Sequence, residues 1–310
     1  MPPTVFLTGA TGFVGSHVLR VLRDADYDVR ALVRSAETKL DAQTVVGDLA
    51  QPGALARALD GCRYVVHCAA LYSFAPHARA MMHRVNVLGT AGLLEAARIA
   101  GVERAVVTSS SATLHAHATN GSAYHRSKVE QERAALAARV PVVLVLPTAP
   151  IGPGDAKPTP TGKLVLDFAC GKIGVAPPRG GMNVVAVEDV ARAHVAALER
   201  GRDRERYVIG GENLTFEDIW ALLARATGRR NPRVRIPYGV LLAAGWCDEL
   251  RCRYLQPGAE PVVPLEGVRM SRERMFVDAQ ASRNALGLGQ PEPAGQTFAR
   301  AVAWYRANAR

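Results

Sequence analysis

The 310-residue sequence contains no apolar run near the roughly 18–20 residues that would be needed to cross a bilayer. Its first residues, MPPTVFLTGA, carry no basic segment ahead of the apolar one, so they favour a first strand over a secretory signal. The chain also lacks internal repeats and low-complexity tracts. Hydrophobic residues make up 48% and charged residues 21%, as is typical of a folded globular protein. We therefore expect a cytoplasmic protein without a transmembrane segment.

The five cysteines include no C-x-x-C pair and are odd in number, which argues against a disulfide or zinc framework. The histidines do not stand at metal-ligand spacing with carboxylates, and we expect no metal site. The net charge of +10 is spread along the chain, and its densest basic runs, ERGRDRER and GRRNPRVR, are mixed or short. Without a recognisable motif, this charge indicates a solvated basic surface and no nucleic-acid partner.

Short β-branched runs alternate with stretches of helical spacing through the first half of the chain. We expect strands at 4–8, 28–33, 44–46, 64–69, 104–110 and 140–147. We expect helices at 13–25, 53–61, 78–100 and 122–138. This alternation predicts an α/β protein of the Rossmann type, a doubly wound parallel sheet with helices on both faces.

The composition of the sequence changes from Pro147 onward, where proline becomes frequent. The sixteen residues PTAPIGPGDAKPTPTG contain five prolines, which exclude a regular helix or a central strand there. Helices are expected beyond this segment at 161–171, 188–200, 215–227 and 238–255, with short strands such as RYVIG between them. We expect residues 148–310 to form mainly a smaller mixed α/β substrate-binding lobe, with 183–200 returning to the first domain.

Three glycines, Gly9, Gly12 and Gly15, lie directly after the first expected strand and at the start of the helix that follows it. In this position they provide a tight turn, let the backbone approach a pyrophosphate, and allow close helix–strand packing. The N–H groups at the start of the helix then face the phosphates. Residues 1–147 are therefore predicted to form a dinucleotide-binding domain. The loop residues expected at the cofactor are Gly9, Thr11, Gly12, Phe13, Val14 and Gly15.

The tip of the second expected strand indicates which dinucleotide is bound. An NAD site usually places a carboxylate there for the ribose 2′-hydroxyl, whereas a 2′-phosphate requires a cation. The strand ends in ALVRS, which puts Arg34 at the tip, and its planar set of donors suits a phosphate. In the alternative interpretation Arg34 is a surface residue and Glu37 turns inward. The residues favour NADP over NAD.

Tyr124 and Lys128 are one helical turn apart and share a helix face. A nearby ammonium lowers the pKa of a phenol, which would allow proton exchange with a substrate oxygen near neutral pH. The pair follows the strand that ends in TSSSAT (108–113), whose serine hydroxyls could hold the same oxygen. This arrangement predicts a catalytic site beside the nicotinamide end of the cofactor.

Taken together, TGATGFVG, GDL (47–49), HCAA (67–70), NVLGT (86–90), TSSSAT and YHRSK resemble the extended short-chain dehydrogenases/reductases, the NAD-dependent epimerase/dehydratase family. Later segments, PTAPIGPGDAKPTPTGK, VIGGENLT and VPLEGVRMSRERMF, are similar to hopanoid-associated sugar epimerases, which are themselves similar to dihydroflavonol 4-reductases. The first resemblance covers the first domain and the second extends through nearly the full chain.

The resemblance implies a role for each matching residue. Tyr124 would be the general acid/base, and Lys128 would lower its pKa and contact the nicotinamide ribose. The catalytic serine falls at Ser110 or Ser111: counting back from the motif favours Ser111, and the reductase-like pattern favours Ser110. Of the two, we prefer Ser111. Asn86 would support the site from a helix, although it could equally make a structural hydrogen bond. The further implied cofactor contacts are Asp48, Leu49, Cys68, Ala69, Ala70, Pro147 and Thr148.

The residues that depart from sugar epimerases favour a reductase. The strand after the catalytic helix ends VLPTAPIGPG without the usual Asn, and His115 replaces the usual Tyr after the serines. With Arg34, these departures favour NADP(H)-dependent reduction of an aldehyde or ketone on a sugar-, polyol- or hopanoid-side-chain-like substrate. The alternatives are an NAD-dependent sugar epimerase/dehydratase and a catalytically idle NADP-binding scaffold protein. The family resemblance also implies a homodimer through 78–100 and 121–139.

Overall fold

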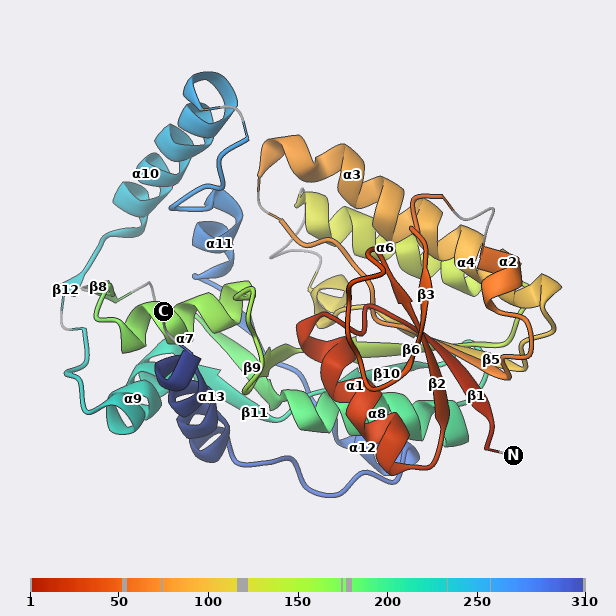
Figure 1. The fold of residues 1–310 in the computed structure, drawn as a ribbon. Helices are drawn as coiled ribbons and strands as arrows, with labels where there is room; N and C mark the ends of the chain where they lie inside the picture. Colours follow the sequence, from red (N-terminus) through yellow and green to blue (C-terminus); the bar gives the residue numbers. More distant parts are fainter. Residues whose placement is uncertain are drawn as a thin grey trace.

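A seven-stranded parallel sheet forms the centre of the first lobe (Figure 1). The computed structural model describes residues 2–51, 55–73, 75–115, 122–173, 175–176, 180–232, 234–256 and 258–308. The strands of the sheet run in the order β10-β6-β5-β4-β1-β2-β3, and every neighbouring pair is parallel. They are β1 (Thr4–Thr8), β2 (Asp28–Val33), β3 (Gln43–Val46), β4 (Tyr64–His67), β5 (Arg104–Thr108), β6 (Val142–Pro147) and β10 (Arg206–Ile209). The expected doubly wound α/β fold is confirmed.

Helices cover both faces of this sheet, because successive side chains of each buried strand point to opposite sides. In β1, Leu7 joins the core under α1 (Phe13–Asp24) and α8 (Val187–Arg200), and Phe6 joins the core on the other side. That second face is covered by α2 (Leu55–Ala58), α4 (Gly89–Ile99) and α6 (Ala123–Leu136) (Figure 1). The central strands are therefore buried on both sides, whereas the edge strand β3 is largely exposed.

The expected long helix at 78–100 is divided by a π-helical turn. It consists of α3 (Arg79–His83), the π turn Arg84–Leu88 and α4, without a break in the chain direction. Short 3-10 turns at Pro76–Ala78 and Ser111–Leu114 flank the site segments. Residues 53 and 54 of the expected helix at 53–61, and residue 121, lie outside the described residues.

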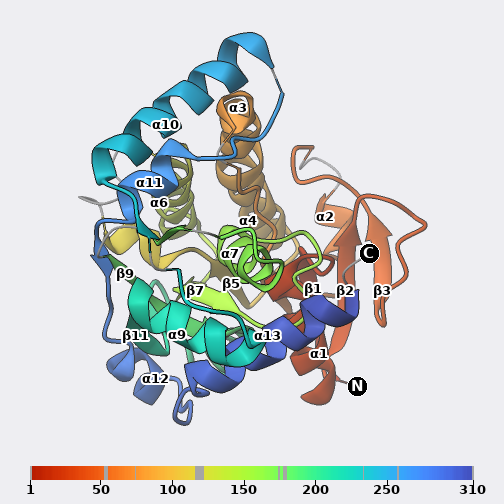
Figure 2. The ribbon, with the colours of Figure 1, turned by 90° about the vertical axis from the view of Figure 1, so that its left-hand side faces the viewer.

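The second lobe packs around its own core, formed mainly by α7, β9, α9 and α13. Figure 2 shows α10 extending away from this core above α11. None of the helices in the described ranges is long and apolar enough to cross a bilayer. The remaining elements are β7 (Ala149–Ile151), α7 (Pro160–Ala169), β8 (Val175–Ala176), β9 (Gly181–Ala186), β11 (Glu212–Thr215), α9 (Phe216–Thr227), β12 (Val234–Arg235), α10 (Tyr238–Leu250), the π turn Arg251–Leu255, α11 (Leu265–Met270), β13 (Arg274–Met275), α12 (Gln280–Ala285) and α13 (Ala294–Asn308).

Part of the chain beyond Pro147 belongs spatially to the first lobe. The helix α8 packs on the sheet beside α1, and Val190 and Ala193 are fully buried there. The strand β10 pairs with β6 at the edge of the large sheet, a position that the sequence analysis did not assign to the RYVIG segment. The sheet therefore needs residues from both halves of the chain.

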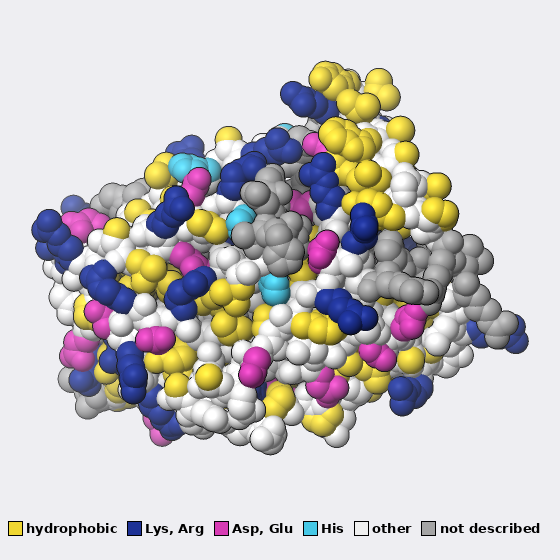
Figure 3. Space-filling model, turned by 180° about the vertical axis from the view of Figure 1, so that it is seen from behind, with side chains coloured by type: hydrophobic (Ala, Val, Ile, Leu, Met, Phe, Trp, Pro, Cys, Tyr) yellow, Lys and Arg dark blue, Asp and Glu magenta, His cyan; other side chains and the backbone are white. Residues whose placement is uncertain are grey.

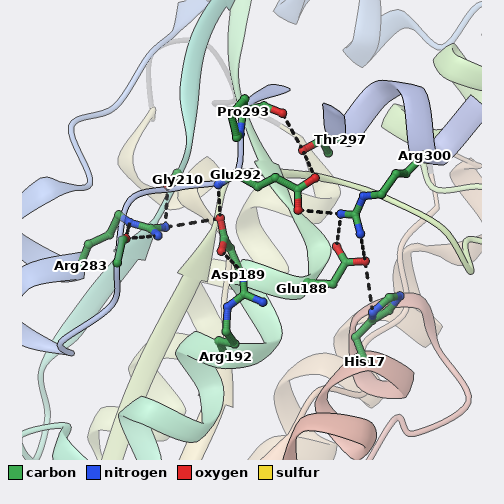
Figure 4. A network of polar contacts seen from close by, with 11 residues as sticks. His17, Glu188, Asp189, Arg192, Gly210, Arg283, Glu292, Pro293, Thr297 and Arg300 are labelled. Atoms are coloured by element: carbon green, nitrogen blue, oxygen red, sulfur yellow. Dashed lines mark hydrogen bonds and ion pairs between the residues drawn. The ribbon is translucent and has the colours of Figure 1, made fainter. Parts of the chain in front are cut away.

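A polar network ties α8 to the C-terminal segments (Figure 4). Asp189 and Arg283 are each about 4% exposed, and their charged atoms lie 3.8 Å apart. Asp189 also accepts a hydrogen bond from the backbone N–H of Glu292 at 3.0 Å and another from Arg192. Beside this pair, Arg300 on α13 forms ion pairs with Glu188, the residue before Asp189, and with Glu292. Burial of Asp189 and Arg283 is tolerated because each carries several hydrogen-bonding partners.

We expect Asp189→Ala to lower the free energy of unfolding by about 3–5 kcal/mol, because it leaves Arg283 buried without its carboxylate. The matched control is Asp41→Ala, which removes an ion pair with Arg23 at 3.6 Å whose carboxylate is 86% exposed. Such exposed pairs contribute less than about 1 kcal/mol. Urea unfolding followed by circular dichroism measures both. Equal losses in the two variants would contradict this interpretation of the network.

Candidate active site

The residues expected to bind a cofactor follow the parallel strands at their carboxyl ends. The glycine loop follows β1, Arg34 follows β2, and the Cys68–Ala70 segment follows β4. Asp48 follows β3 within two residues, and Pro147 ends β6. The order of the strands reverses between β1 and β4, and in open α/β sheets ligands bind at such a switch point. The fold thus brings the residues predicted to bind the cofactor to the carboxyl edge of the large sheet.

The glycine loop fits a dinucleotide phosphate in its backbone geometry. Gly9 has φ +78°, and a Cβ there would lie 2.6 Å from the backbone nitrogen of Ala69. A Cβ on Gly15 would lie 2.0 Å from the Gly9 carbonyl oxygen, so the helix could not approach the loop with any side chain at this position. Gly12 caps α1, whose first N–H groups point out of the helix toward this edge.

Arg34 is exposed directly beyond the end of β2. A turn begins at Ser35, whose hydroxyl accepts the backbone N–H of Glu37 at 3.2 Å. Glu37 is exposed as well, so both candidates for reading the ribose lie at this tip. Asp48 bonds the N–H of Ala50 through its side chain at 2.9 Å. Arg34 and Glu37 are thus both exposed where the ribose of a dinucleotide is read in this class of fold.

Tyr124 lies in the first turn of α6, which begins after the capping residue Ser122. Its hydroxyl forms a hydrogen bond with the Ser110 side chain, and its ring packs against Tyr72 with 4.2 Å between centroids. Burial raises the pKa of the Tyr124 phenol to about 12, although the Ser110 hydrogen bond works in the opposite direction. Ser111 is the first residue of the following 3-10 turn. The serine that contacts the phenol is therefore Ser110.

The ammonium group of Lys128 is buried, with the side chain at the same helix face as Tyr124. It donates to the carbonyl oxygen of Thr108 at 3.0 Å and to the Gln131 amide oxygen at 2.9 Å. Burial lowers the pKa of Lys128 to about 8, with Glu132 opposing the shift. From the sequence, we expect this ammonium to lower the pKa of the Tyr124 phenol. In this structure its hydrogen bonds go to the end of β5 and to its own helix.

A buried chain of hydrogen bonds continues from Lys128 into the sheet. The Gln131 amide nitrogen donates to the Thr90 hydroxyl at 3.0 Å, and the same oxygen is 2.8 Å from His67 Nε2. His67 Nδ1 lies 2.6 Å from the hydroxyl of Thr8 at the end of β1. Burial, together with the nearby Lys128, lowers the pKa of His67 to about 3. The histidine is therefore neutral, and the chain links the lysine rigidly to β1 and β4.

Asn86 lies in the π turn and is fully buried. Its amide oxygen accepts the N–H of Leu71 at 2.7 Å, and its nitrogen donates to the Leu71 carbonyl at 2.9 Å. The nitrogen also lies 3.2 Å from the hydroxyl of Ser127 on α6. These contacts hold the segment before Tyr72 against the catalytic helix. The amide supports the site through the backbone, and no substrate contact is needed to explain its burial.

Glu132 fixes the serine segment to the catalytic helix, and the sequence analysis did not identify it. Its carboxylate accepts hydrogen bonds from Ser109 and from Thr113, the latter at 2.9 Å, and pairs with Arg206 at 2.8 Å. The available signal was its spacing, since it lies four residues after Lys128 on the same helix face. Glu132 thereby holds Ser109 and Thr113, which lie on either side of Ser110 in the chain.

The second lobe reaches the site through Glu266 on α11. The Ser122 hydroxyl donates to its carboxylate at the start of the catalytic helix. Burial raises the pKa of Glu266, while the Ser122 hydrogen bond and the nearby Arg126, Arg79 and Arg269 oppose this shift. Ser122 and Glu266 are 144 residues apart, so no local pattern could have joined them.

Thr148 and Pro147 lie where β6 leaves the sheet. The Thr148 hydroxyl donates to the amide oxygen of Asn183 on β9 at 2.9 Å, and that oxygen also accepts the N–H of Gly211. The Asn183 nitrogen donates to the Asn213 side chain at 2.7 Å. The amide of Asn183 is thus used in joining β6 to the second lobe.

Comparisons with known proteins cover the whole chain. The family model described as the NAD dependent epimerase/dehydratase family matches residues 5–210. A protein named "Putative dihydroflavonol 4-reductase" from Synechocystis sp. is 37% identical, covering 99% of this chain and 95% of the relative. Sterol demethylase protein B from Methylococcus capsulatus is 32% identical, covering 98% of both chains. Ceramide reductase from Caulobacter vibrioides is 30% identical, covering 98% of this chain and 94% of the relative.

Solved structures agree with this assignment. The crystal structure of gox2253 superposes with a TM-score of 0.84 at 35% identity, covering 99% of both chains. MoeE5 in complex with UDP-glucose and NAD superposes with a TM-score of 0.74 at 24% identity, covering 99% of this chain and 100% of the other, and shares the fold. The chain belongs to the NAD-dependent epimerase/dehydratase family of extended short-chain dehydrogenases/reductases, whose reductases and epimerases bind a pyridine nucleotide.

Proposed function

We propose that the protein is an NADP(H)-dependent reductase of an aldehyde or ketone on a lipophilic substrate, the hopanoid side chain being one member of that class. The observation that carries this proposal is the half-buried Tyr124, whose hydroxyl is bonded to Ser110 beyond the carboxyl end of β5. The relatives named for a dihydroflavonol, a sterol and a ceramide support the lipophilic class. Two of these three names also describe reductases.

The protein's own groups supply the proton chemistry of such a reduction. A bound nicotinamide would supply the hydride to the carbonyl carbon. Tyr124 then gives its proton to the carbonyl oxygen, and a pKa of about 12 keeps the phenol protonated at neutral pH. Ser110 donates to the same oxygen and polarises the carbonyl. Proton transfer would leave a phenolate at Tyr124, and the positive charge of Lys128, held one helical turn away by Thr108 and Gln131, would stabilise it.

Arg34 supports the preference for NADP over NAD. It stands at the tip of β2, where the ribose of a dinucleotide is read in this class of fold. A guanidinium offers two parallel hydrogen bonds to a 2′-phosphate, and each charge-assisted bond contributes about 1.5–3 kcal/mol. The alternative remains NAD with Glu37 turned toward the ribose.

The second candidate function is an NAD-dependent sugar epimerase or dehydratase, which the family name and the UDP-glucose complex of MoeE5 favour. An epimerase needs polar groups that grip the sugar beyond β6. In this chain the segment after β6 carries Thr148, whose hydroxyl is bonded to Asn183. The four hydrogen-bonding positions of that amide are taken by Thr148, Gly211 and Asn213. This arrangement supports the reductase over the epimerase, and the intact Ser110, Tyr124 and Lys128 set argues against an idle scaffold.

The purified protein should consume NADPH anaerobically with a sterol or sphingoid ketone presented in cyclodextrin. Tyr124→Phe should lower kcat by a factor of about 10²–10⁴, because it removes the proton donor, while NADPH binding measured by fluorescence changes little. A bound NAD that never exchanges with the medium would contradict the reductase. Full turnover by Tyr124→Phe would contradict the assigned acid.

The neighbouring serines provide a matched pair of variants for the same assay. Ser110→Ala should lower kcat roughly 10–100-fold, because the hydroxyl that contacts Tyr124 is lost. Ser111→Ala removes the same number of atoms one residue away and should stay within about threefold of wild type. The opposite ranking would assign the role to Ser111.

Arg34→Ala tests the choice of cofactor. The KM for NADPH should rise roughly 10–100-fold through the loss of charge-assisted hydrogen bonds, while the KM for NADH changes less than about threefold. Glu37→Gln is the companion variant, with the same exposed position three residues along. If Glu37→Gln weakens NADH while Arg34→Ala leaves NADPH unchanged, the site is selective for NAD.

The pKa of Lys128, lowered to about 8 by burial, predicts a pH dependence of cofactor use. The ammonium form exists below this value and is lost as the pH rises through it. The kcat/KM for NADPH, which reports groups of the free enzyme, should therefore fall about tenfold per pH unit above 8. In Lys128→Arg the charge persists and this fall should vanish, at a lower overall rate. A wild-type profile that stays flat to pH 10 would exclude the lysine as the titrating group.

A further inference from the structure

The segment 238–262 exposes apolar side chains although it begins with a helix of largely apolar sequence. In α10, YGVLLAAGWCDEL, only Gly245 is buried. A helix that is apolar on most sides is ordinarily buried in a core or against a partner. Six of the eleven large hydrophobic side chains exposed in the described chain lie here, and we name them the docking face: Val240, Trp246, Leu250, Tyr254, Leu255 and Val262. Figure 3 shows hydrophobic side chains gathered over the projecting corner where α10 lies.

Arginines lie over the aromatic rings of this segment. The guanidinium carbon of Arg272 is 4.6 Å from the centroid of the Tyr238 ring. Arg269 lies in the same way over Trp246 at 5.9 Å. Arg253 lies over Tyr254 at 5.5 Å. Three of the four arginine–aromatic stacks among the described residues thus belong to one hairpin, by which we mean α10, the π turn Arg251–Leu255, and α11 with the residues directly after it.

The carboxylates of α10 are each paired within the protein. Asp248 bonds Arg251 at 2.7 Å, and Glu249 lies 3.5 Å from Arg79 on α3. The charges of Asp248 and Glu249 are therefore balanced locally, whereas Glu260 is exposed in the same segment and accepts the Ser73 hydroxyl. The exposed arginines stacked on the three rings outnumber this carboxylate. Trp and Tyr with adjacent arginines are the residues that favour the boundary between lipid tails and head groups.

We propose that the docking face rests on the surface of an anionic lipid bilayer, with its apolar side chains among the upper acyl chains and its arginines at the head groups. Interfacial helices bind in this way through buried apolar area combined with attraction to anionic lipid. Each arginine near such a surface contributes about 1 kcal/mol, and added salt screens it. The arginines distinguish this occupant from an uncharged apolar partner.

The segment that carries the docking face leads into α11, which contacts the start of α6. The hairpin returns through α11, where Glu266 accepts the Ser122 hydroxyl at the start of the catalytic helix. A lipophilic substrate would thus leave the bilayer beside the entrance to the site. This link to substrate delivery rests on the proposed function, whereas the docking face itself rests on exposure and charge.

Vesicle flotation with the full-length protein tests the proposal. The wild type should float with vesicles of phosphatidylcholine containing phosphatidylglycerol, and several-fold less with phosphatidylcholine alone or at high salt. The variant carrying Tyr254→Ser and Leu255→Ser should bind at least about tenfold more weakly, because two exposed apolar side chains are removed. Quenching of tryptophan fluorescence by brominated lipid should fall strongly in Trp246→Phe, since Trp220 is buried and Trp304 packs half-buried against the core of the second lobe.

The matched control carries Val46→Ser and Ile99→Ser, which are 56% and 62% exposed on the first lobe and should leave vesicle binding unchanged. Absence of wild-type flotation, or equal losses in the two double variants, would overturn the proposal. A concentration-dependent dimer that only the Tyr254→Ser and Leu255→Ser variant abolishes would assign the face to a second copy instead. NADPH oxidation with a water-soluble ketone, measured without vesicles, fails separately if the proposed reductase is wrong.

Discussion

The burial of one ammonium group is the constraint on which the site depends. Moving a lysine charge from water into the interior costs several kcal/mol unless hydrogen bonds replace its hydration. Lys128 meets this requirement through the Thr108 carbonyl and the Gln131 amide, which fix it between the end of β5 and its own helix. An ammonium has three donors, and we propose that the third serves the ribose of the cofactor. The lysine thereby fixes the position of α6 relative to the carboxyl end of β5.

The hydrogen bonds behind the lysine have a defined direction. The Thr90 hydroxyl donates its proton to the Asn86 carbonyl at 2.6 Å, so its oxygen can only accept from its other neighbours. Gln131 therefore donates to it through Nε2, which leaves the amide oxygen facing Lys128. His67 must likewise donate through Nε2, and its Nδ1 accepts from Thr8. A second proton on His67 would break this pattern and place a cation near Lys128, which agrees with its strongly lowered pKa.

The fold and the ends of its strands follow from local pattern, but the contacts inside the site do not. Short β-branched runs that alternate with helical stretches predict the sheet, and the order of the motifs places each loop at one edge. The choice between Ser110 and Ser111 escaped this reasoning because it depends on where the 3-10 turn begins. The extended backbone of Ser110, with φ −159° and ψ 144°, directs its side chain differently from a residue inside the turn. Glu266 escaped it because only tertiary structure joins it to Ser122.

Arg269 and Arg79 each contact α10 and also lie near the Glu266 carboxylate, which contacts the start of α6. Burial raises the pKa of Glu266, and Arg269, which lies over Trp246 on the docking face, opposes this rise; the Glu266 carboxylate accepts the Ser122 hydroxyl. Arg79 pairs with Glu249 of α10 and acts on the same carboxylate. Burial raises the pKa of Tyr124, and the Glu266 carboxylate adds to this shift. The surface that we assign to lipid and the proton donor that we assign to catalysis thus share one set of charges.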